Sequence, residues 1–343
     1  MFNPRFTITQ KLLENIKRIA VLIAELNNKS FPNTILLEME KTARAISSHS
    51  STSIEGNPLP LTEVKRILKN KPENIRDTEQ EVLNYNRALE ELNKFTKSSK
   101  DHLDVALILE IQKIVTNKLL TPYNNGKLRR EPVFVNNPKL QKTVYWPPDD
   151  QDVKHLLTEL IKYTKDNKFK IDSLVLAGIF HKQFVIIHPF IDGNGRTSRL
   201  LTKLLLANVG LNTFNLFSFE NYYNQNVTKY FQKVGVFGNY YDLENKIDFT
   251  AWLEYFTDGI IDELLRVGTE LKTLSITPDT RLESYHEKLL EYIKKHGYSN
   301  DKLYSTLTDR AKATRSLDFQ KLINLKMIER FGKGKATYYK LKQ

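Results

Sequence analysis

Apolar residues recur three and four positions apart over most of the chain up to Leu271, with charged residues between them. This spacing places the apolar side chains on one face of a helix, so the chain is predicted to be mainly α-helical. The expected helices cover residues 7–27, 34–53, 61–70, 75–97, 102–119, 152–166, 172–188, 196–208, 219–234 and 249–271.

Residues 121–150 depart from the helical pattern. The stretch PYNNG is a turn signal, and the runs PVFV (132–135) and KTVYW (142–146) are rich in β-forming residues on either side of an Asn-Asn-Pro turn. We therefore expect one β-hairpin, within residues 126–148, inserted between helices.

The C-terminal part follows a third pattern. SITPDT, residues 275–280, is a polar break, after which three helical segments precede two β-rich runs around a Gly-Lys turn. This order resembles a winged helix, a small α+β domain. We therefore expect three regions: an N-terminal helical region over 1–100, a core over 101–274 and a C-terminal domain over 275–343.

Composition narrows the class of protein. The 343 residues are 40% hydrophobic, which is enough for a folded core. No apolar run reaches the length of about 18 residues that a membrane span needs, so we expect a cytoplasmic protein. The chain has no cysteine, which excludes disulfides and thiolate chemistry, and its net charge of +12 favours anionic partners such as nucleotides or nucleic acid.

Residues 188–199, HPFIDGNGRTSR, concentrate polar chemistry between two apolar helices. Pro189 disfavours helical backbone at the preceding residue, so His188 is expected at a helix end. Gly193 and Gly195 permit backbone angles that would let successive amides converge on an anion where the next helix begins. His181, seven residues before His188, is expected to be a core histidine.

Charged side chains in the same run complete a candidate site. Arg196 and Arg199 lie three apart in the first turn of a helix and can both face an anion held at the loop. Asp192 offers one hard oxygen ligand, which suits Mg²⁺ that takes its other ligands from phosphates and water. A helix-end histidine or a GNG turn alone is more often structural, but the combination with His188 as a base favours phosphoryl or nucleotidyl transfer.

This run resembles the signature of the Fic family, HxFx(D/E)GNGRxxR, with every fixed position present. Members are helical and transfer AMP from ATP to a hydroxyl side chain of a target protein. The resemblance implies that His188 is the base that deprotonates the target hydroxyl, that Phe190 anchors the loop and that Asp192 holds Mg²⁺. The implied ATP phosphate ligands are Gly193, Asn194, Gly195, Arg196 and Arg199.

A second motif lies upstream, in SSHSSTSIEGNPL, residues 47–59. Ser51 and Glu55 share a helix face and Gly56 can end that helix, so this is, taken alone, a helix C-terminus with an exposed acid. SxxxEG also resembles the Fic inhibitory motif (S/T)xxxE(G/N), which implies an ion pair between Glu55 and Arg199. A carboxylate there would take the place of the γ-phosphate and leave ATP unfit for transfer.

The predicted hairpin resembles the flap of Fic proteins, whose strand edge holds the target segment extended across the site. The alternative is a hairpin that only covers the core. The candidate target contacts are Val133, Val135, Val144 and Tyr145.

ENYYNQN, residues 220–226, resembles the segment that lines the adenine pocket in relatives. Tyr222 and Tyr223 are therefore candidate contacts of the base, although tyrosines at helical spacing are more often packing residues.

The C-terminal domain is rich in Lys and Arg, which suits phosphate contacts on a DNA duplex, although winged helices also dock proteins. The candidate contacts there are Arg310, Lys312, Arg315, Lys333 and Lys335.

Together these features predict a Fic-type helical bundle with a flap and a winged-helix-like domain. The favoured function is a protein adenylyltransferase that uses ATP and Mg²⁺ and is inhibited in cis by Glu55. The alternatives are a DNA-binding regulator whose core senses nucleotide, or a Fic enzyme that removes AMP, transfers UMP or transfers phosphate. The target, modification of the chain itself and the oligomeric state stay open at this point.

Overall fold

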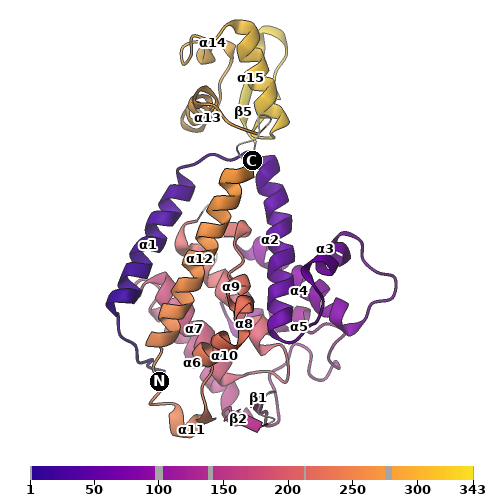
Figure 1. Ribbon diagram of the computed structural model, residues 1–343, viewed down its shortest axis with the longest axis vertical. Coiled ribbons are helices and arrows are strands. Elements are labelled where there is room, and N and C mark those ends of the chain that lie inside the picture. Colours follow the sequence, from indigo (N-terminus) through magenta and orange to yellow (C-terminus); the bar gives the residue numbers. More distant parts are fainter. Residues whose placement is uncertain (1, 97–102, 138–141, 212–213, 275–279, 343) are drawn as a thin grey trace. The chain divides into compact units, whose positions relative to one another are not determined.

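The computed structural model describes residues 2–96, 103–137, 142–211, 214–274 and 280–342, which are mainly helical (Figure 1). The mainly α fold predicted from the sequence is confirmed. The chain divides into two compact units. The first comprises Met1–Ala24 with Thr42–Leu264, and the second comprises Glu25–Lys41 with Leu265–Gln343.

The helices up to Leu274 follow the predicted order, apart from α11 (Tyr240–Leu243), which was not predicted. They are α1 (Gln10–Asn27), α2 (Asn33–Ile54), α3 (Leu61–Lys69), α4 (Asp77–Thr96), α5 (Val105–Val115), α6 (Asp150–Asp166), α7 (Ser173–Ile187), α8 (Asn194–Leu206), α9 (Glu220–Gln225), α10 (Val227–Val234), α11 (Tyr240–Leu243) and α12 (Thr250–Leu274).

The core of the first unit is built around α7, whose side chains are almost all buried. Helices α4, α5, α6 and α8 contribute apolar side chains to the same cluster, among them Leu89, Ile111, Leu157 and Leu200. Because other helices cover it, α7 is apolar on every side rather than amphipathic. His188, the residue after the C-terminal end of this buried helix, is therefore held rigidly in place.

Helices α1 and α12 lie side by side in the first unit (Figure 1). Asn15 donates from Nδ2 to Asp258 Oδ1 at 2.8 Å, and Lys11 pairs with Asp258 at 2.7 Å. The N-terminal helix is thus fixed to the long helix that closes this unit.

Two predicted helices are wrong in their length. The helix expected over 102–119 is α5, which already ends at Val115. The segment expected as a single helix over 219–234 is two helices, α9 and α10, separated at Asn226, whose backbone is not helical, with φ −146° and ψ 75°. The Asn226 side chain accepts a hydrogen bond from the Lys229 amide at 2.9 Å, so it starts a new helix as an N-cap.

The hairpin consists of β1 (Val135–Asn137) and β2 (Lys142–Trp146), which pair antiparallel. Pairing begins at Val135, three residues after the start of the predicted run PVFV. Pro132 cannot take part because it has no N–H to donate to a ladder. The end of the predicted Asn-Asn-Pro turn falls outside the described residues. A short unpredicted strand, β3 (Gly238–Asn239), pairs with β2 in parallel and gives the sheet order β1-β2-β3.

The second unit has its own small core. Helices α13 (Ser284–His296), α14 (Asp301–Tyr304) and α15 (Lys312–Asn324) precede the antiparallel pair β4 (Ile328–Phe331) and β5 (Tyr338–Leu341). Leu289, Phe319 and Leu322 are among the side chains buried between them. Among the helices of the described residues, none combines the length and apolar character needed to cross a membrane.

Candidate active site

The conformation of the loop between α7 and α8 is stabilised by its own side chains. His188 ends α7 in a left-handed conformation, with φ 51° and ψ 60°. Phe190 is fully buried, and the centroid of its ring lies 6.3 Å from that of Phe184. Asn194 accepts from the Phe190 amide at 2.9 Å and donates back to the Phe190 carbonyl at 2.8 Å. The Asn194 side chain therefore fixes the loop and does not face a ligand.

His188 carries the chemistry of a base. Its Nδ1 lies 3.1 Å from the Val185 carbonyl oxygen, which can only accept, so the proton is on Nδ1 and the lone pair is on Nε2. Burial lowers the pKa of His188 and the Arg129 charge adds to this, while the Val185 bond and the carboxylates of Glu55 and Asp192 offset only a part. The imidazole is thus neutral near pH 7.

Arg129 holds this loop and was missed by the sequence reasoning. Its Nε donates to the His188 carbonyl at 2.9 Å and its backbone amide to the Pro189 carbonyl at 3.0 Å. Its Nη2 donates to the Pro148 carbonyl, beyond β2. Arg129 is only 3% exposed, yet nothing in the sequence distinguishes it from its exposed neighbour Arg130.

The two glycines of the loop have different roles, which corrects the expectation that both supply unusual backbone angles. Gly193 has φ +82° at the start of α8, which favours glycine. Gly195 lies inside α8, but a Cβ there would lie 2.2 Å from Glu55 Oε1 and 3.0 Å from Arg199 Nη1. A side chain at position 195 would therefore displace the Glu55 carboxylate from Arg199.

Arg199 is fully buried and is held by the end of α2. Its Nε donates to Ser51 Oγ at 2.8 Å, and its Nη2 donates to the Ser51 carbonyl at 2.9 Å and to Glu55 Oε1 at 2.7 Å. Burial lowers the pKa of Arg199, but the Glu55 carboxylate together with the Tyr230 and Tyr85 hydroxyls raises it above its ordinary value. Gly56, with φ +98°, follows as the chain leaves the helix. The structure thus brings Ser51 and Glu55 to Arg199, and Gly56 follows where the helix ends.

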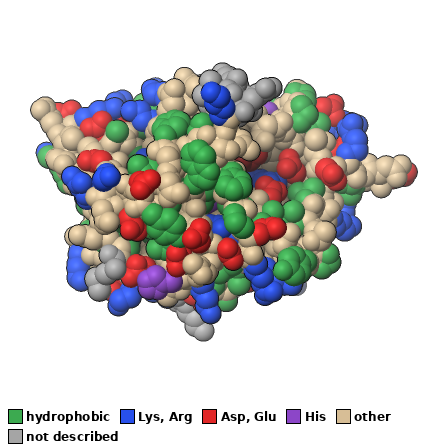
Figure 2. Space-filling view, turned by 90° about the horizontal axis from the view of Figure 1, so that it is seen from below, with side chains coloured by type: hydrophobic (Ala, Val, Ile, Leu, Met, Phe, Trp, Pro, Cys, Tyr) green, Lys and Arg blue, Asp and Glu red, His purple; other side chains and the backbone are tan. Residues whose placement is uncertain are grey.

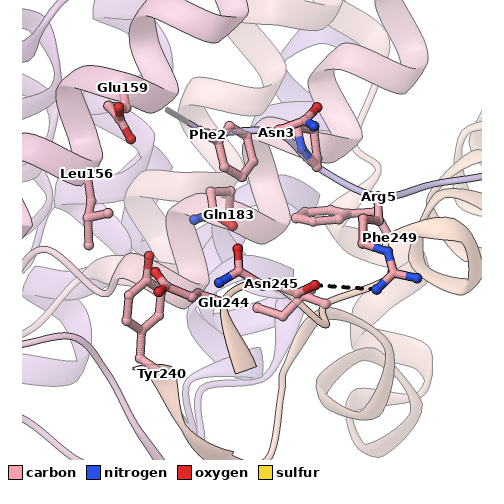
Figure 3. Close-up of a pocket in the computed structure, with 12 residues that line it drawn as sticks. Phe2, Asn3, Arg5, Leu156, Glu159, Gln183, Tyr240, Glu244, Asn245 and Phe249 are labelled. Carbon is pink, nitrogen blue, oxygen red and sulfur yellow. Dashed lines mark hydrogen bonds between the residues drawn. The ribbon is translucent and has the colours of Figure 1, made fainter. Parts of the chain in front are cut away.

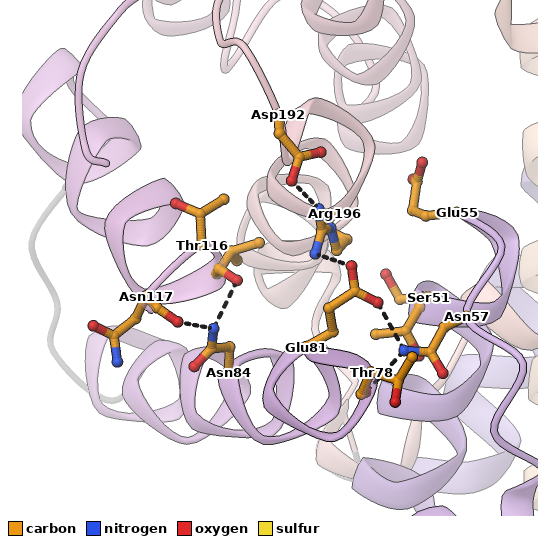
Figure 4. Close-up of polar contacts among 12 residues, drawn as sticks. Ser51, Glu55, Asn57, Thr78, Glu81, Asn84, Thr116, Asn117, Asp192 and Arg196 are labelled. Atoms are coloured by element: carbon orange, nitrogen blue, oxygen red, sulfur yellow. Dashed lines mark hydrogen bonds and ion pairs between the residues drawn. The ribbon is translucent and has the colours of Figure 1, made fainter. Parts of the chain in front are cut away.

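Arg196 lies between two carboxylates (Figure 4). Its Nη2 donates to Asp192 Oδ2 at 2.6 Å and its Nη1 to Glu81 Oε1 at 3.0 Å. Its side chain is 3% exposed, whereas that of Asp192 is 48% exposed. Burial lowers the pKa of Arg196, but Asp192, Glu55 and Glu81 together raise it. Glu81 was missed, because in the sequence it is one of many charged residues between the apolar positions of α4.

Unpaired donors remain at the start of α8. Arg196 Nε and Thr197 Oγ1 are buried and have no hydrogen-bond partner within the described part of the chain. Together with the amides at the helix N-terminus, they suit an anion. No group of three or more side chains that could hold a metal ion occurs among the described residues. The Asp192 carboxylate lies beside these donors and is half-exposed.

The flap residues divide into inward and outward side chains. Val133, Val135 and Val144 are half-buried, but Tyr145 is 3% exposed and donates from its hydroxyl to the Ile186 carbonyl at 2.9 Å. Tyr145 as a target contact is therefore corrected: its side chain packs inward. The exposed aromatic side chains of this segment are Phe134 and Trp146. Figure 2 shows the face on the side of β1 and β2, where hydrophobic and acidic side chains alternate.

The tyrosines expected at the adenine ring are not equivalent. Tyr223 is fully buried and stacks on Tyr230 with ring centroids 4.7 Å apart, so it is a packing residue and its expected contact with a base is corrected. Tyr222 is half-buried beside Tyr255. His181 is fully buried with its ring nitrogens 3.0 Å from Thr202 Oγ1 and 3.1 Å from the Tyr230 hydroxyl, which confirms a core histidine.

A cavity of about 410 Å³ lies apart from the loop (Figure 3). Its walls come from the N-terminal segment, α6, α7 and α11, and include Phe2, Gln183, Tyr240 and Glu244. None of the residues predicted as functional lines this cavity.

Two of the basic residues expected on DNA are engaged inside the second unit. Arg310 binds Asp318 through Nε at 2.8 Å and Nη2 at 3.1 Å, and Arg315 binds Asp301 through the same atoms at 2.8 and 3.1 Å. These arginines hold the fold together, which corrects their assignment as phosphate contacts. Lys312 and Lys333 are exposed, and the Lys335 side chain lies outside the described residues.

This loop lies in a segment that is similar to known proteins. The Fic/DOC family model matches residues 102–206. The protein adenylyltransferase Fic of Aedes aegypti is 29% identical over 217 residues, covering 58% of this chain and 42% of that protein. The protein adenylyltransferase fic-1 of Caenorhabditis elegans is 30% identical over 185 residues, covering 52% and 34%. The chain thus spans less than half the length of these relatives.

Solved structures show the same fold. A Fic family protein from Desulfovibrio desulfuricans superposes with a TM-score of 0.65 at 20% identity, covering 99% of this chain and 98% of that chain. Fic-1 from C. elegans superposes with a TM-score of 0.60 at 22% identity, covering 77% and 74%. At these identities the likeness concerns the fold alone.

Proposed function

Since residues 102–206 are a Fic/DOC family domain, we propose that this chain is a protein adenylyltransferase that moves AMP from ATP to a Ser, Thr or Tyr hydroxyl of a target protein. The observation that carries the proposal is the loop itself: a neutral His188 with its lone pair on Nε2 lies beside an anion site with two buried arginines. The names of the curated relatives support the same activity.

The proposed reaction is an in-line displacement. The target hydroxyl oxygen attacks the α-phosphorus of ATP, and His188 Nε2 takes the hydroxyl proton. The bond from the α-phosphorus to its bridging oxygen breaks, and pyrophosphate leaves with that electron pair. Arg129 contributes by holding the His188 and Pro189 carbonyls, so that the imidazole does not shift during proton transfer.

The phosphates would lie at the start of α8. The amides of Gly193, Asn194 and Gly195 and the guanidinium groups of Arg196 and Arg199 supply donors for them. Asp192 would hold Mg²⁺: a single half-exposed carboxylate fits a cation whose other ligands are phosphate oxygens and water. When bound, Mg²⁺ supplies neutralisation of the phosphate charge.

The resting state is proposed to be inhibited in cis. Glu55 occupies Arg199 Nη2 and places a negative charge beside it, so Arg199 is not available to a phosphate. Transfer then requires Glu55 to leave Arg199. A target segment would pair with the free edge of β1, the outer strand of the sheet, near Val133, Val135 and Val144.

The second unit has the element order of a winged helix, and we propose that it is one. DNA binding has less support, because Arg310 and Arg315 are tied to acids of the same unit. A role in docking proteins is compatible with the exposed Lys312 and Lys333.

Label transfer tests the function. The protein with Mg²⁺ is given α-labelled or γ-labelled ATP, alone and with lysate, as wild type, Glu55→Gly and Glu55→Gly/His188→Ala. The proposal expects label from the α-position only, raised by the first change and abolished by the second. Transfer of the γ-label would indicate phosphotransfer instead. No transfer from either position, with ATP still bound, would favour a nucleotide sensor.

A further inference from the structure

The donors of Arg196 are used unequally. Nη1 is bound by Glu81 and Nη2 by Asp192, while Nε is buried and has no partner in the part of the chain that the structure describes. A guanidinium is planar, so one firm bond at Nη1 and a buried stem restrict the direction of its opposite edge. That edge carries Nε and Nη2, the pair that binds a phosphate through two parallel hydrogen bonds.

Asp192 and Glu81 differ in how firmly they are held. The Asp192 side chain is 48% exposed, and Arg196 is its partner at 2.6 Å. Glu81 is 24% exposed and has a second bond, since its Oε2 accepts from Asn57 Nδ2 at 2.7 Å. Asp192 can therefore turn from Arg196 to a cation, whereas Glu81 stays in place.

Asn57 fixes Glu81 from the end of the inhibitory motif (Figure 4). Its Nδ2 also donates to the Thr78 carbonyl at 2.8 Å, and its Oδ1 accepts from the Leu59 amide at 3.1 Å. Asn57 is only 8% exposed and follows Glu55 by two residues. The turn that places Glu55 on Arg199 thus also fixes the acid on Arg196.

We infer that Glu81 is a positioning residue for Arg196: it holds Nη1 so that the Nε–Nη2 edge faces the ATP phosphates, and Asn57 links it to the inhibitory turn. This inference rests on the proposed function, because it assumes that the anion at the loop is ATP. A purely structural acid would stabilise the buried Arg196 without affecting how ATP binds, so ATP affinity separates the two roles.

Changing the acceptor of Arg196 Nη1 provides a sharp test. Glu81→Gln keeps the size of the side chain, but the amide can accept only one of its two bonds and turns an N–H towards either Arg196 or Asn57. Glu63→Gln is the matched control, since Glu63 lies on α3 and pairs with the exposed Arg66.

The affinity for ATP with Mg²⁺ is measured by calorimetry in the Glu55→Gly/His188→Ala protein, which binds without reacting. Glu81→Gln is expected to weaken binding about tenfold, the worth of one charge-assisted hydrogen bond. Glu63→Gln is expected to leave the affinity unchanged. In the Glu55→Gly enzyme, which keeps His188, Glu81→Gln should raise the KM for ATP by the same factor and leave kcat constant.

The opposite results are equally clear. If Glu81→Gln lowers only the melting temperature and binds ATP as tightly as its parent, Glu81 does not position Arg196. If the Glu55→Gly enzyme transfers no label while the ATP affinities still follow the expected order, the adenylyltransferase proposal falls and the role of Glu81 stands.

Discussion

Glu55 and Arg199 are 144 residues apart in the sequence, yet Glu55 Oε1 lies 2.7 Å from Arg199 Nη2. The arginine is fully buried and the carboxylate keeps 29% of its side-chain surface exposed. The exposed partner is the one that can leave. A buried arginine that stays in place, with an acid that can move into solvent, has the asymmetry that a reversible inhibitor needs.

Replacing Glu55 should remove the inhibition and raise the rate of AMP transfer. Glu55→Gly frees Arg199 Nη2 for a phosphate, and we expect the rate of AMP transfer to rise about tenfold or more. The rate is measured with α-labelled ATP, and Glu63→Gly serves as a control that removes an acid from the exposed surface of α3. An equal rate for Glu55→Gly and the wild type would refute inhibition by this residue.

Gly195→Ala tests how tightly the pair fills its space. The new Cβ would lie 2.2 Å from Glu55 Oε1, so the carboxylate must turn away from Arg199, and we expect the broken ion pair to cost about 1–3 kcal/mol in the free energy of unfolding. In Glu55→Gly that oxygen is gone and only Arg199 Nη1, at 3.0 Å, stays close to the new Cβ, so the same change should cost less than about 1 kcal/mol. Urea denaturation of the four proteins measures this coupling, which additive effects would disprove.

The pH dependence of transfer should follow His188. Its pKa lies below the ordinary histidine value of about 6.5, so the neutral, proton-accepting form predominates at and above that pH. In Glu55→Gly, kcat/KM should therefore be level from about pH 6.5 upward and fall only at lower pH, as the imidazole takes a proton. If kcat/KM already falls well above pH 6.5 as the pH is lowered, another group, or a charged His188, limits the reaction.

Two aromatic residues of the flap should respond in opposite ways. Tyr145→Phe removes the hydrogen bond to the Ile186 carbonyl and should cost about 1 kcal/mol of stability without changing the KM for a target protein. Trp146→Ala removes an exposed ring and should raise that KM while the melting temperature stays constant. The reverse pattern would place the target contact on the inner face of β2.

The sequence predicted the parts of the site that lie within short motifs. HPFIDGNGRTSR and SSTSIEG each fix their own local geometry, and the family resemblance joined Glu55 to Arg199 across the intervening chain. Arg129 and Glu81 could not be found in this way. Each acts through one long-range contact, to the His188 carbonyl or to Arg196, and neither has a distinctive neighbour in the sequence.

The same limit explains the errors. Apolar and aromatic periodicity in ENYYNQN gives a helix face but does not tell whether a ring meets a ligand or another ring, and Tyr223 meets Tyr230. In the hairpin, alternation puts successive side chains on opposite faces. Which face turns inward depends on α7, whose Ile186 carbonyl receives the Tyr145 hydroxyl.

The fluorescence of the exposed Trp146 also gives a signal from the flap. The chain has two tryptophans, and the other, Trp252, is fully buried with its Nε1 donating to the Gly178 carbonyl at 2.8 Å. A soluble quencher such as iodide would therefore reach Trp146 and spare Trp252. Shielding of this one emitter by an arriving polypeptide would report the encounter in real time, without any attached dye.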